Sequence, residues 1–183
     1  MRDELTWEAT DPRGVERRLD ALGLGRLPIS IVATGRRHDR LVAPAAVPGA
    51  RSPEPLADPL LAIGWATVEL DRAASDFGGG FADAPQDELL GAFVRMRGPL
   101  LLLEPSTEGR LAATLARHGE GPAALYVRAP GGDLGAGVAR ATERGARFSL
   151  RATGPLGPSV LLLGGSAWGP HAILVGSATI GTP

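Results

Sequence analysis

The pattern of apolar and polar positions repeats a strand–helix opening three times along the chain. In the first repeat, apolar residues alternate and then recur every three or four positions, which is typical of a strand followed by a helix. Asp11 is a favourable N-cap for that helix, and Gly23 suits its C-terminal end. The expected elements are a strand at 5–10, a helix at 12–22, and strands at 28–34 and 40–47.

The second repeat follows a proline-rich stretch at 48–59, which is typical of a linker. Its first expected elements are a strand at 61–70 and a short helix from Asp71 that is broken by glycines at 78–80. Strands at 89–97 and 99–104 follow, and then a helix that is capped by Ser106 and Thr107 and ends at Gly119. The third repeat has the clearest β-α-β-β-β order. Its expected elements are a strand at 123–128, a helix from Asp133 to Gly145, and strands at 147–152, 159–164 and 171–176.

Repetition of such a unit predicts an α+β fold in which paired βαβββ modules form a cupped mixed sheet. We divide the chain into a reduced βαββ module at 1–47, a linker at 48–59, paired βαβββ modules at 60–177 and a tail at 178–183.

Composition narrows the classes of partner. The 183 residues are 44% hydrophobic and include no cysteine, which excludes disulfides and Cys-based zinc sites. The net charge is −1, so the chain lacks the basic field that nucleic-acid binding needs, and all 19 basic residues are arginine. No signal peptide and no membrane-length apolar stretch is found, so we expect a cytoplasmic protein without a membrane partner.

Four short motifs occur in a fixed order within the last two thirds of the chain. They are LAIGWA at 61–66, ELDRA at 69–73, LLLLEP at 100–105 and GPAAL at 121–125. In this order they resemble the methylmalonyl-CoA epimerase branch of the vicinal oxygen chelate (glyoxalase-like) superfamily. The resemblance implies paired βαβββ modules with a ligand cup.

The same resemblance implies a divalent metal held by His and Glu side chains. Carried onto this sequence, those ligands fall at Ala62, at Leu101, at Ala123 or Ala124, and near Leu174. Alanine and leucine side chains have no lone pairs to donate to a metal ion. We therefore predict a metal-free pocket, without a cofactor, that binds a small organic molecule.

Five residues are candidates for ligand contacts. Trp65 and Tyr126 alternate with apolar neighbours on strands that would line the cup, and Arg97 could grip a carboxylate or phosphate. Trp168 lies in a Gly/Pro turn, and His171 opens the last strand, where it could exchange a proton near neutral pH.

Two other functions stay open. The first is an enzyme of this superfamily (a lyase, isomerase or dioxygenase) with a relocated or absent metal, in which His171 or Glu104 does acid–base work. The second is an association module that forms a homodimer. An enzyme predicts an ionisable group with a shifted pKa inside the cup, and a binder predicts an apolar cup with one or two polar anchors. An association module predicts a filled cup and an exposed apolar face.

Other chemistries fit the sequence less well. The glycines at 131–137 do not have dinucleotide-binding spacing, and the sequence at 164–168 lacks the last glycine of a nucleophile elbow. His38 belongs to a charged turn and His118 to a helix end, so both are expected to be structural.

Overall fold

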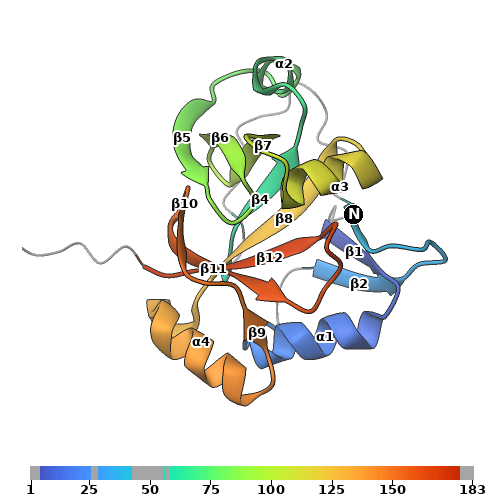
Figure 1. Ribbon diagram of the computed structural model, residues 1–183, viewed down its shortest axis with the longest axis vertical. Helices are drawn as coiled ribbons and strands as arrows, with labels where there is room; N and C mark the ends of the chain where they lie inside the picture. The colour runs from blue at the N-terminus through green and yellow to red at the C-terminus, as the bar shows by residue number, and fades with distance from the viewer. Residues whose placement is uncertain (1–4, 26–28, 43–55, 57, 178–183) are drawn as a thin grey trace, which may run out of the picture.

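The computed structural model describes residues 5–25, 29–42, 56 and 58–177. The chain forms a small N-terminal sheet and a large curled sheet, with helices packed outside them (Figure 1). The N-terminal elements are β1 (Leu5–Ala9), α1 (Pro12–Ala21), β2 (Ile29–Ala33) and β3 (Arg40–Val42). No helix in the described residues is long and apolar enough to cross a membrane.

The large sheet consists of two βαβββ modules. The first contains β4 (Leu60–Ala66), α2 (Leu70–Asp76), β5 (Ala82–Asp87), β6 (Ala92–Arg97) and β7 (Leu100–Pro105). The second contains β8 (Gly121–Arg128), α4 (Leu134–Glu143), β9 (Arg147–Phe148), β10 (Ala152–Gly154), β11 (Gly157–Leu163) and β12 (His171–Val175). Helix α3 (Arg110–His118) joins the modules, and a short 3₁₀ turn at Pro130–Gly132 precedes α4. The predicted α+β fold of paired βαβββ modules is confirmed.

Strand pairing places the opening strands of the two modules at the centre. The order is β10-β11-β12-β8-β4-β7-β6-β5, with β9 also on β11. β4 runs antiparallel to β8, whereas each pairs in parallel with the last strand of its own module, β7 and β12.

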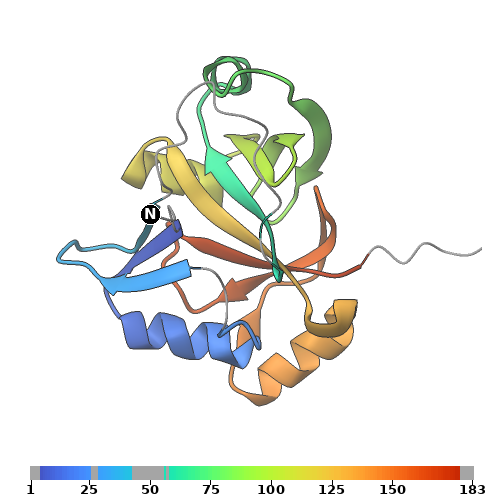
Figure 2. The same ribbon diagram turned by 180° about the vertical axis from the view of Figure 1, so that it is seen from behind.

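The sheet curls until its two ends meet. Glu88, which follows β5, donates its backbone N–H to the Thr153 carbonyl oxygen of β10 at 3.5 Å, and the Thr153 N–H donates to Glu88 Oε2 at 3.1 Å. Figure 2 shows the resulting cup from behind, with β4 and β8 crossing in front. The cup is therefore closed on itself by the chain's own strands.

The N-terminal unit has the predicted βαββ order. Asp11 caps α1 by accepting the Gly14 N–H at 2.9 Å, and Gly23 follows the helix with a φ of +74°. Trp7 and Leu19 of this unit belong to the same buried core as Leu125 of β8. The division into a module at 1–47, a linker and a body remains a prediction, and the predicted linker at 48–59 (apart from 56, 58 and 59) and tail at 178–183 lie outside the described residues.

Several element boundaries differ from the sequence prediction. β5 was not expected, because Ala82–Asp87 has no apolar alternation and contains a proline. The expected strand at 89–97 begins only at Ala92, since Asp87 accepts the Leu89 and Leu90 N–H groups and forms a turn. Two further differences concern a helix start and a split strand: α3 has Gly109 as its N-cap rather than Ser106 or Thr107, and 147–152 divides into β9 and the start of β10.

Candidate functional site

The inside of the cup is an apolar core. Ala62, Leu101, Ala123 and Ala124, where the resemblance would place metal ligands, all belong to one buried cluster. Leu174 faces the core that the large sheet shares with the N-terminal unit, whereas its neighbours Ile173 and Val175 point into the cup. None of these side chains can donate an electron pair, so the residues present do not fit a metal ion. Across the described part of the chain, no group of three His, Cys, Asp or Glu side chains is placed to hold one.

Tyr126 fills the middle of the cup. Its side chain is 1% exposed, and its hydroxyl donates a 2.6 Å hydrogen bond to Asp87 Oδ2. The ring lies against Gly64, where an added Cβ would be 3.2 Å from Tyr126 Cε2 and 2.6 Å from Leu103 Cδ1. Small residues on β4 thus make the space that the tyrosine ring occupies.

Asp87 is a buried carboxyl group with a full set of donors. Its Oδ1 accepts the Leu89 and Leu90 N–H groups at 2.9 and 3.0 Å. Burial raises the pKa of Asp87, and the hydrogen bonds from Tyr126 and the backbone oppose that rise. Burial and the nearby Asp87 also raise the pKa of Tyr126.

His171 forms a second buried polar pair, with Thr114 of α3. Thr114 Oγ1 donates its only proton to the Arg110 carbonyl oxygen at 2.9 Å, so the 3.0 Å contact with His171 requires the histidine Nε2–H to donate. Burial, with smaller contributions from Arg110 and His118, lowers the pKa of His171 to about 4. The imidazole is therefore neutral at pH 7.

A substitution at Gly64 tests whether the cup is full. We expect Gly64→Ala to lower the free energy of unfolding by about 1–3 kcal/mol, because the new methyl group has to displace Leu103 or Tyr126. Chemical denaturation measures this change. Gly35→Ala is the matched control, since a Cβ at Gly35 meets nothing within 4 Å. Equal stability of the two variants would mean that the cup has spare room.

A groove lies outside the cup, between α2 and the start of β8. Its volume is about 180 Å³, and it is lined by Trp65, Thr67, Arg72, Ala73, Asp76, Phe77 and Glu120. Trp65 and Phe77 meet edge to face, with ring centroids 5.1 Å apart. Aromatic rings therefore form one wall of the groove, and charged groups form the other.

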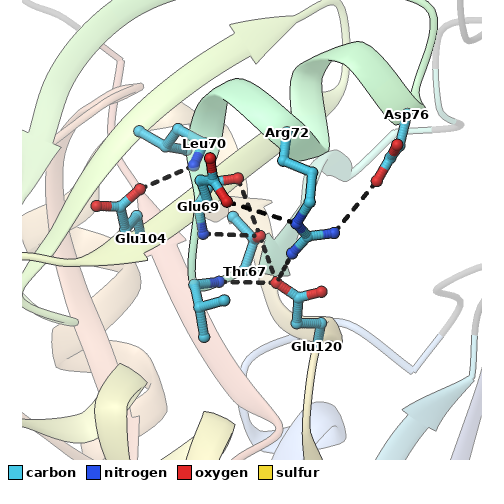
Figure 3. Close-up of polar contacts among 8 residues, drawn as sticks. Thr67, Glu69, Leu70, Arg72, Asp76, Glu104 and Glu120 are labelled. Carbon is cyan, nitrogen blue, oxygen red and sulfur yellow. Dashed lines mark hydrogen bonds and ion pairs between the residues drawn. The ribbon is translucent and has the colours of Figure 1, made fainter.

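The charged wall is a fixed network centred on Glu120 (Figure 3). Glu120 Oε1 accepts the Thr67 hydroxyl at 2.6 Å, the Val68 N–H at 2.8 Å and a guanidinium N–H of Arg72. The hydrogen bonds from Arg72, Thr67 and Val68, in that order, lower the pKa of Glu120 to about 2. This carboxylate is ionised at every pH at which the protein is expected to work.

Arg72 and Glu104 hold α2 beside the groove. Arg72 also contacts Asp76 at 3.2 Å and Glu69 at 3.8 Å, so one guanidinium faces three carboxylates. Glu104 Oε2 accepts the Leu70 N–H at 2.8 Å at the first residue of the helix (Figure 3). Glu104 points away from the cup, on the same face of β7 as Leu102.

The five residues predicted to contact a ligand lie in three places. Tyr126 and His171 are buried in the cup, at 1% and 3% exposure. Trp65 forms part of the groove, and Arg97 lies further along the same outer face. Trp168 is on the loop before β12. The structure therefore does not bring these residues together into one pocket.

The environments of Arg97 and Trp168 explain this separation. Arg97 donates to the Gly79 carbonyl oxygen at 2.6 Å and lies 4.7 Å from the centre of the Phe81 ring. The ring centres of Trp168 and His38 are 5.1 Å apart. The Arg117 guanidinium carbon lies 4.4 Å from the centre of the Trp168 ring. Both side chains thus contact neighbouring segments of the chain instead of lining a common pocket.

Sequence reasoning missed the residues that define both polar networks. Asp87 lies in a stretch without a strand pattern, and its partner is 39 positions away. Glu120 stands between two glycines at the junction of α3 and β8, and this position was the only hint of a special role.

Comparison with solved structures identifies the fold. A variant of Streptomyces coelicolor methylmalonyl-CoA epimerase in complex with 2-nitronate-propionyl-CoA is 25% identical, with a TM-score of 0.56, over 68% of this chain and 97% of the epimerase. A methylmalonyl-CoA epimerase in complex with methylmalonyl-CoA and NH4+ is similar to the same extent. The Mycobacterium tuberculosis methylmalonyl-CoA epimerase is 22% identical, with a TM-score of 0.56, over 67% of this chain and 93% of that enzyme. No protein-family model matches the chain, and no curated protein matches it by sequence.

Proposed function

We propose that this chain, which has the fold of the vicinal oxygen chelate superfamily, binds a small organic molecule without a metal ion and does not transform it. The observation that carries this proposal is the groove beside α2, where an aromatic wall faces a charged wall outside the cup. A filled cup is also expected of an association module, so the cup supports only the part of the proposal that concerns the metal ion. Tyr126 and its apolar neighbours occupy the space around the positions where the resemblance places metal ligands. Epimerase structures of this fold hold CoA esters, whereas here we assign the ligand to the groove beside α2.

The shape of the groove limits what it can hold. Ligand pockets for drug-sized molecules are roughly 300–1,000 Å³. A groove of about 180 Å³ instead suits a single ring or a short branched group, with the rest of the ligand in solvent. Trp65 and Phe77 offer aromatic contact to such a group.

The charge of the groove favours a neutral or cationic ligand. Arg72 is the one cation among its lining residues, and Glu69, Asp76 and Glu120 neutralise it and leave excess negative charge. An organic cation would be attracted both by the carboxylates and by the face of the Trp65 ring. An anion of the same shape would be repelled.

The enzyme alternative is supported by one observation. Asp87 and His171 are buried in the cup with shifted pKa values, and shifted pKa values are common at catalytic sites. However, Tyr126 and Thr114 already bond to these side chains, which are 1% and 3% exposed. Since a substrate has no exposed atom of either group to reach, binding is the better-supported function.

Titration with three matched probes tests the binding site. We expect phenethylammonium to give a saturable shift of the Trp65 indole N–H signal in a nitrogen–proton correlation spectrum, and phenylacetate to give none. In calorimetric titration, which does not depend on the indole signal, Trp65→Ala should bind phenethylammonium about tenfold or more weakly, since a good aromatic contact contributes about 1–3 kcal/mol. Benzyl alcohol, a neutral probe, should bind with intermediate affinity.

Trp168→Ala is the control for this experiment, because Trp168 lies outside the groove. It should bind phenethylammonium as the unmodified protein does. Loss of binding in Trp168→Ala, or preference for phenylacetate, would contradict the assignment to the groove. Native mass spectrometry of freshly purified protein tests the metal separately: a stoichiometric divalent metal would contradict metal-free binding.

A further inference from the structure

A second cleft lies between α1 and α4, at the opposite end of the molecule from α2 (Figure 1). The two helices are in contact and lie at the same end in both views (Figure 2). The volume of the cleft is about 320 Å³. Its lining residues are Asp11, Gly14, Arg17, Arg18, Ala21, Arg144, Gly145 and Ala146.

Three arginines line this cleft together with a single carboxylate, that of Asp11. Arg17 is 3.7 Å from Asp11 Oδ2, beyond hydrogen-bond distance, and Asp11 Oδ1 is already bound to the Gly14 N–H. The Arg18 guanidinium donates to the Gly164 carbonyl oxygen at 3.4 Å. Within the described part of the chain, Arg144 has no carboxylate within 4 Å. The cleft therefore carries excess positive charge.

Some arginines elsewhere on this protein are matched differently. Arg72 faces three carboxylates, and Arg95 pairs with both Asp71 and Asp83. The whole chain has slightly more acidic than basic residues, with a net charge of −1. Other arginines of the described residues also have no ion pair, so the distinctive feature of the cleft is that three guanidinium groups line one space with a single carboxylate.

The backbone leaves room between these guanidinium groups. Positions 14, 17, 18 and 21 lie on one face of α1, and the lining residues other than the arginines and Asp11 are glycine and alanine. Arg144 follows α4 in a fixed turn, since its N–H bonds to the Ala141 carbonyl oxygen and the Gly145 N–H bonds to Thr142. Arginines from two separate elements therefore face a common space.

We infer that this cleft binds a small multivalent oxyanion of the phosphate type. Guanidinium groups present paired N–H donors that match two oxygens of a phosphate, and they remain charged at all working pH values. A volume of about 320 Å³ holds a phosphate group together with a small organic part. The net charge of −1 disfavours a long nucleic acid, so the ligand is a small molecule.

Calorimetric titration with inorganic pyrophosphate at low salt tests this site. We expect saturable binding of one anion, and an apparent dissociation constant about tenfold or more higher for the double variant Arg17→Ala/Arg144→Ala, because two charge-assisted contacts are lost. Both side chains are exposed, so the melting temperature should stay the same. Arg144→Gln alone, which keeps the size of the side chain, should weaken binding by a smaller factor.

A charge-matched control separates a site from a general charge effect. Arg37→Ala/Arg151→Ala removes two exposed arginines that do not line the cleft. This control should bind pyrophosphate within about twofold of the unmodified protein. Absence of saturable binding, unchanged binding by Arg17→Ala/Arg144→Ala, or equal weakening in both double variants would each overturn the inference. The Trp65→Ala variant should bind pyrophosphate normally, so the two sites can fail independently.

Discussion

Replacing Tyr126 by alanine is expected to lower the free energy of unfolding by about 3–5 kcal/mol, measured by chemical denaturation. The ring is 1% exposed and lies among Gly64, Ala124 and Leu103, none of which can move far enough to fill the space. The substitution also leaves Asp87 Oδ2 without its donor. The loss therefore combines a cavity with an unsatisfied buried acceptor.

Two further variants divide this loss into its parts. Tyr126→Phe keeps the ring and removes only the hydrogen bond, so we expect a loss of about 1–3 kcal/mol. Gly64→Ala in the Tyr126→Ala background should cost less than in the natural protein, because the added methyl group then meets Ala124 and Leu103 but no ring. Strict additivity of the two substitutions would show that Tyr126 and Gly64 do not compete for the same space.

Acidification from pH 6.5 to about pH 4 is expected to remove about 3 kcal/mol of stability through His171. Burial lowers the pKa of His171 from 6.5 to about 4, so the folded protein keeps this imidazole neutral while the unfolded chain binds a proton. Stability is therefore fully present above pH 6.5 and is lost as the pH falls toward the folded-state pKa. Denaturation curves at several pH values measure the slope.

Other titratable groups change the stability of the protein in a different direction or over a different pH range. Glu120, whose pKa is lowered to about 2, loses its contribution only as the pH falls from 4.5 toward 2. The raised pKa of Asp87 changes stability in the opposite direction. The folded protein binds this proton more tightly than the unfolded chain does, so the contribution of Asp87 to stability becomes more favourable as the pH falls. His118 also has a lowered pKa, so it adds to the same slope as His171.

His171→Gln isolates the contribution of His171. Glutamine does not titrate, and its amide can still donate to Thr114 Oγ1. We expect this variant to be less stable at pH 7 and to lose less stability than the natural protein between pH 6.5 and 4. A slope unchanged by the substitution would mean that the buried imidazole does not control acid stability.

The sequence contains enough local information to predict the fold. Alternation on β6 separates Val94 from Arg95 and Arg97, as the period of a strand requires, although the structure places Val94 and not the arginines inside the cup. Asp11 and Asp133 cap α1 and α4 through the hydrogen bonds expected of N-cap residues. Such features depend on neighbours within a few positions, so a single sequence reveals them.

The candidate sites depend on contacts between distant positions. Tyr126 was predicted to contact a ligand because it alternates on a strand, but its partner Asp87 comes from β5, which has no strand pattern. Likewise, Glu120 bonds to Arg72 across 48 positions. The sequence therefore indicates which residues share a face of a strand, whereas the structure decides which face points inward. Trp65 and Arg97, which were predicted to line the cup, lie outside it.

The closure of the large sheet also limits how two copies of the chain could pair. β10 bonds to β11 on one side and to Glu88 on the other, so it offers no continuous row of free backbone groups. β5 carries Pro85, which lacks an N–H, and the charged Asp83, both of which disfavour addition of a strand. Self-association by adding a strand to either end of the large sheet is thus disfavoured, so two copies that meet at this sheet would have to pack through side chains instead of backbone hydrogen bonds.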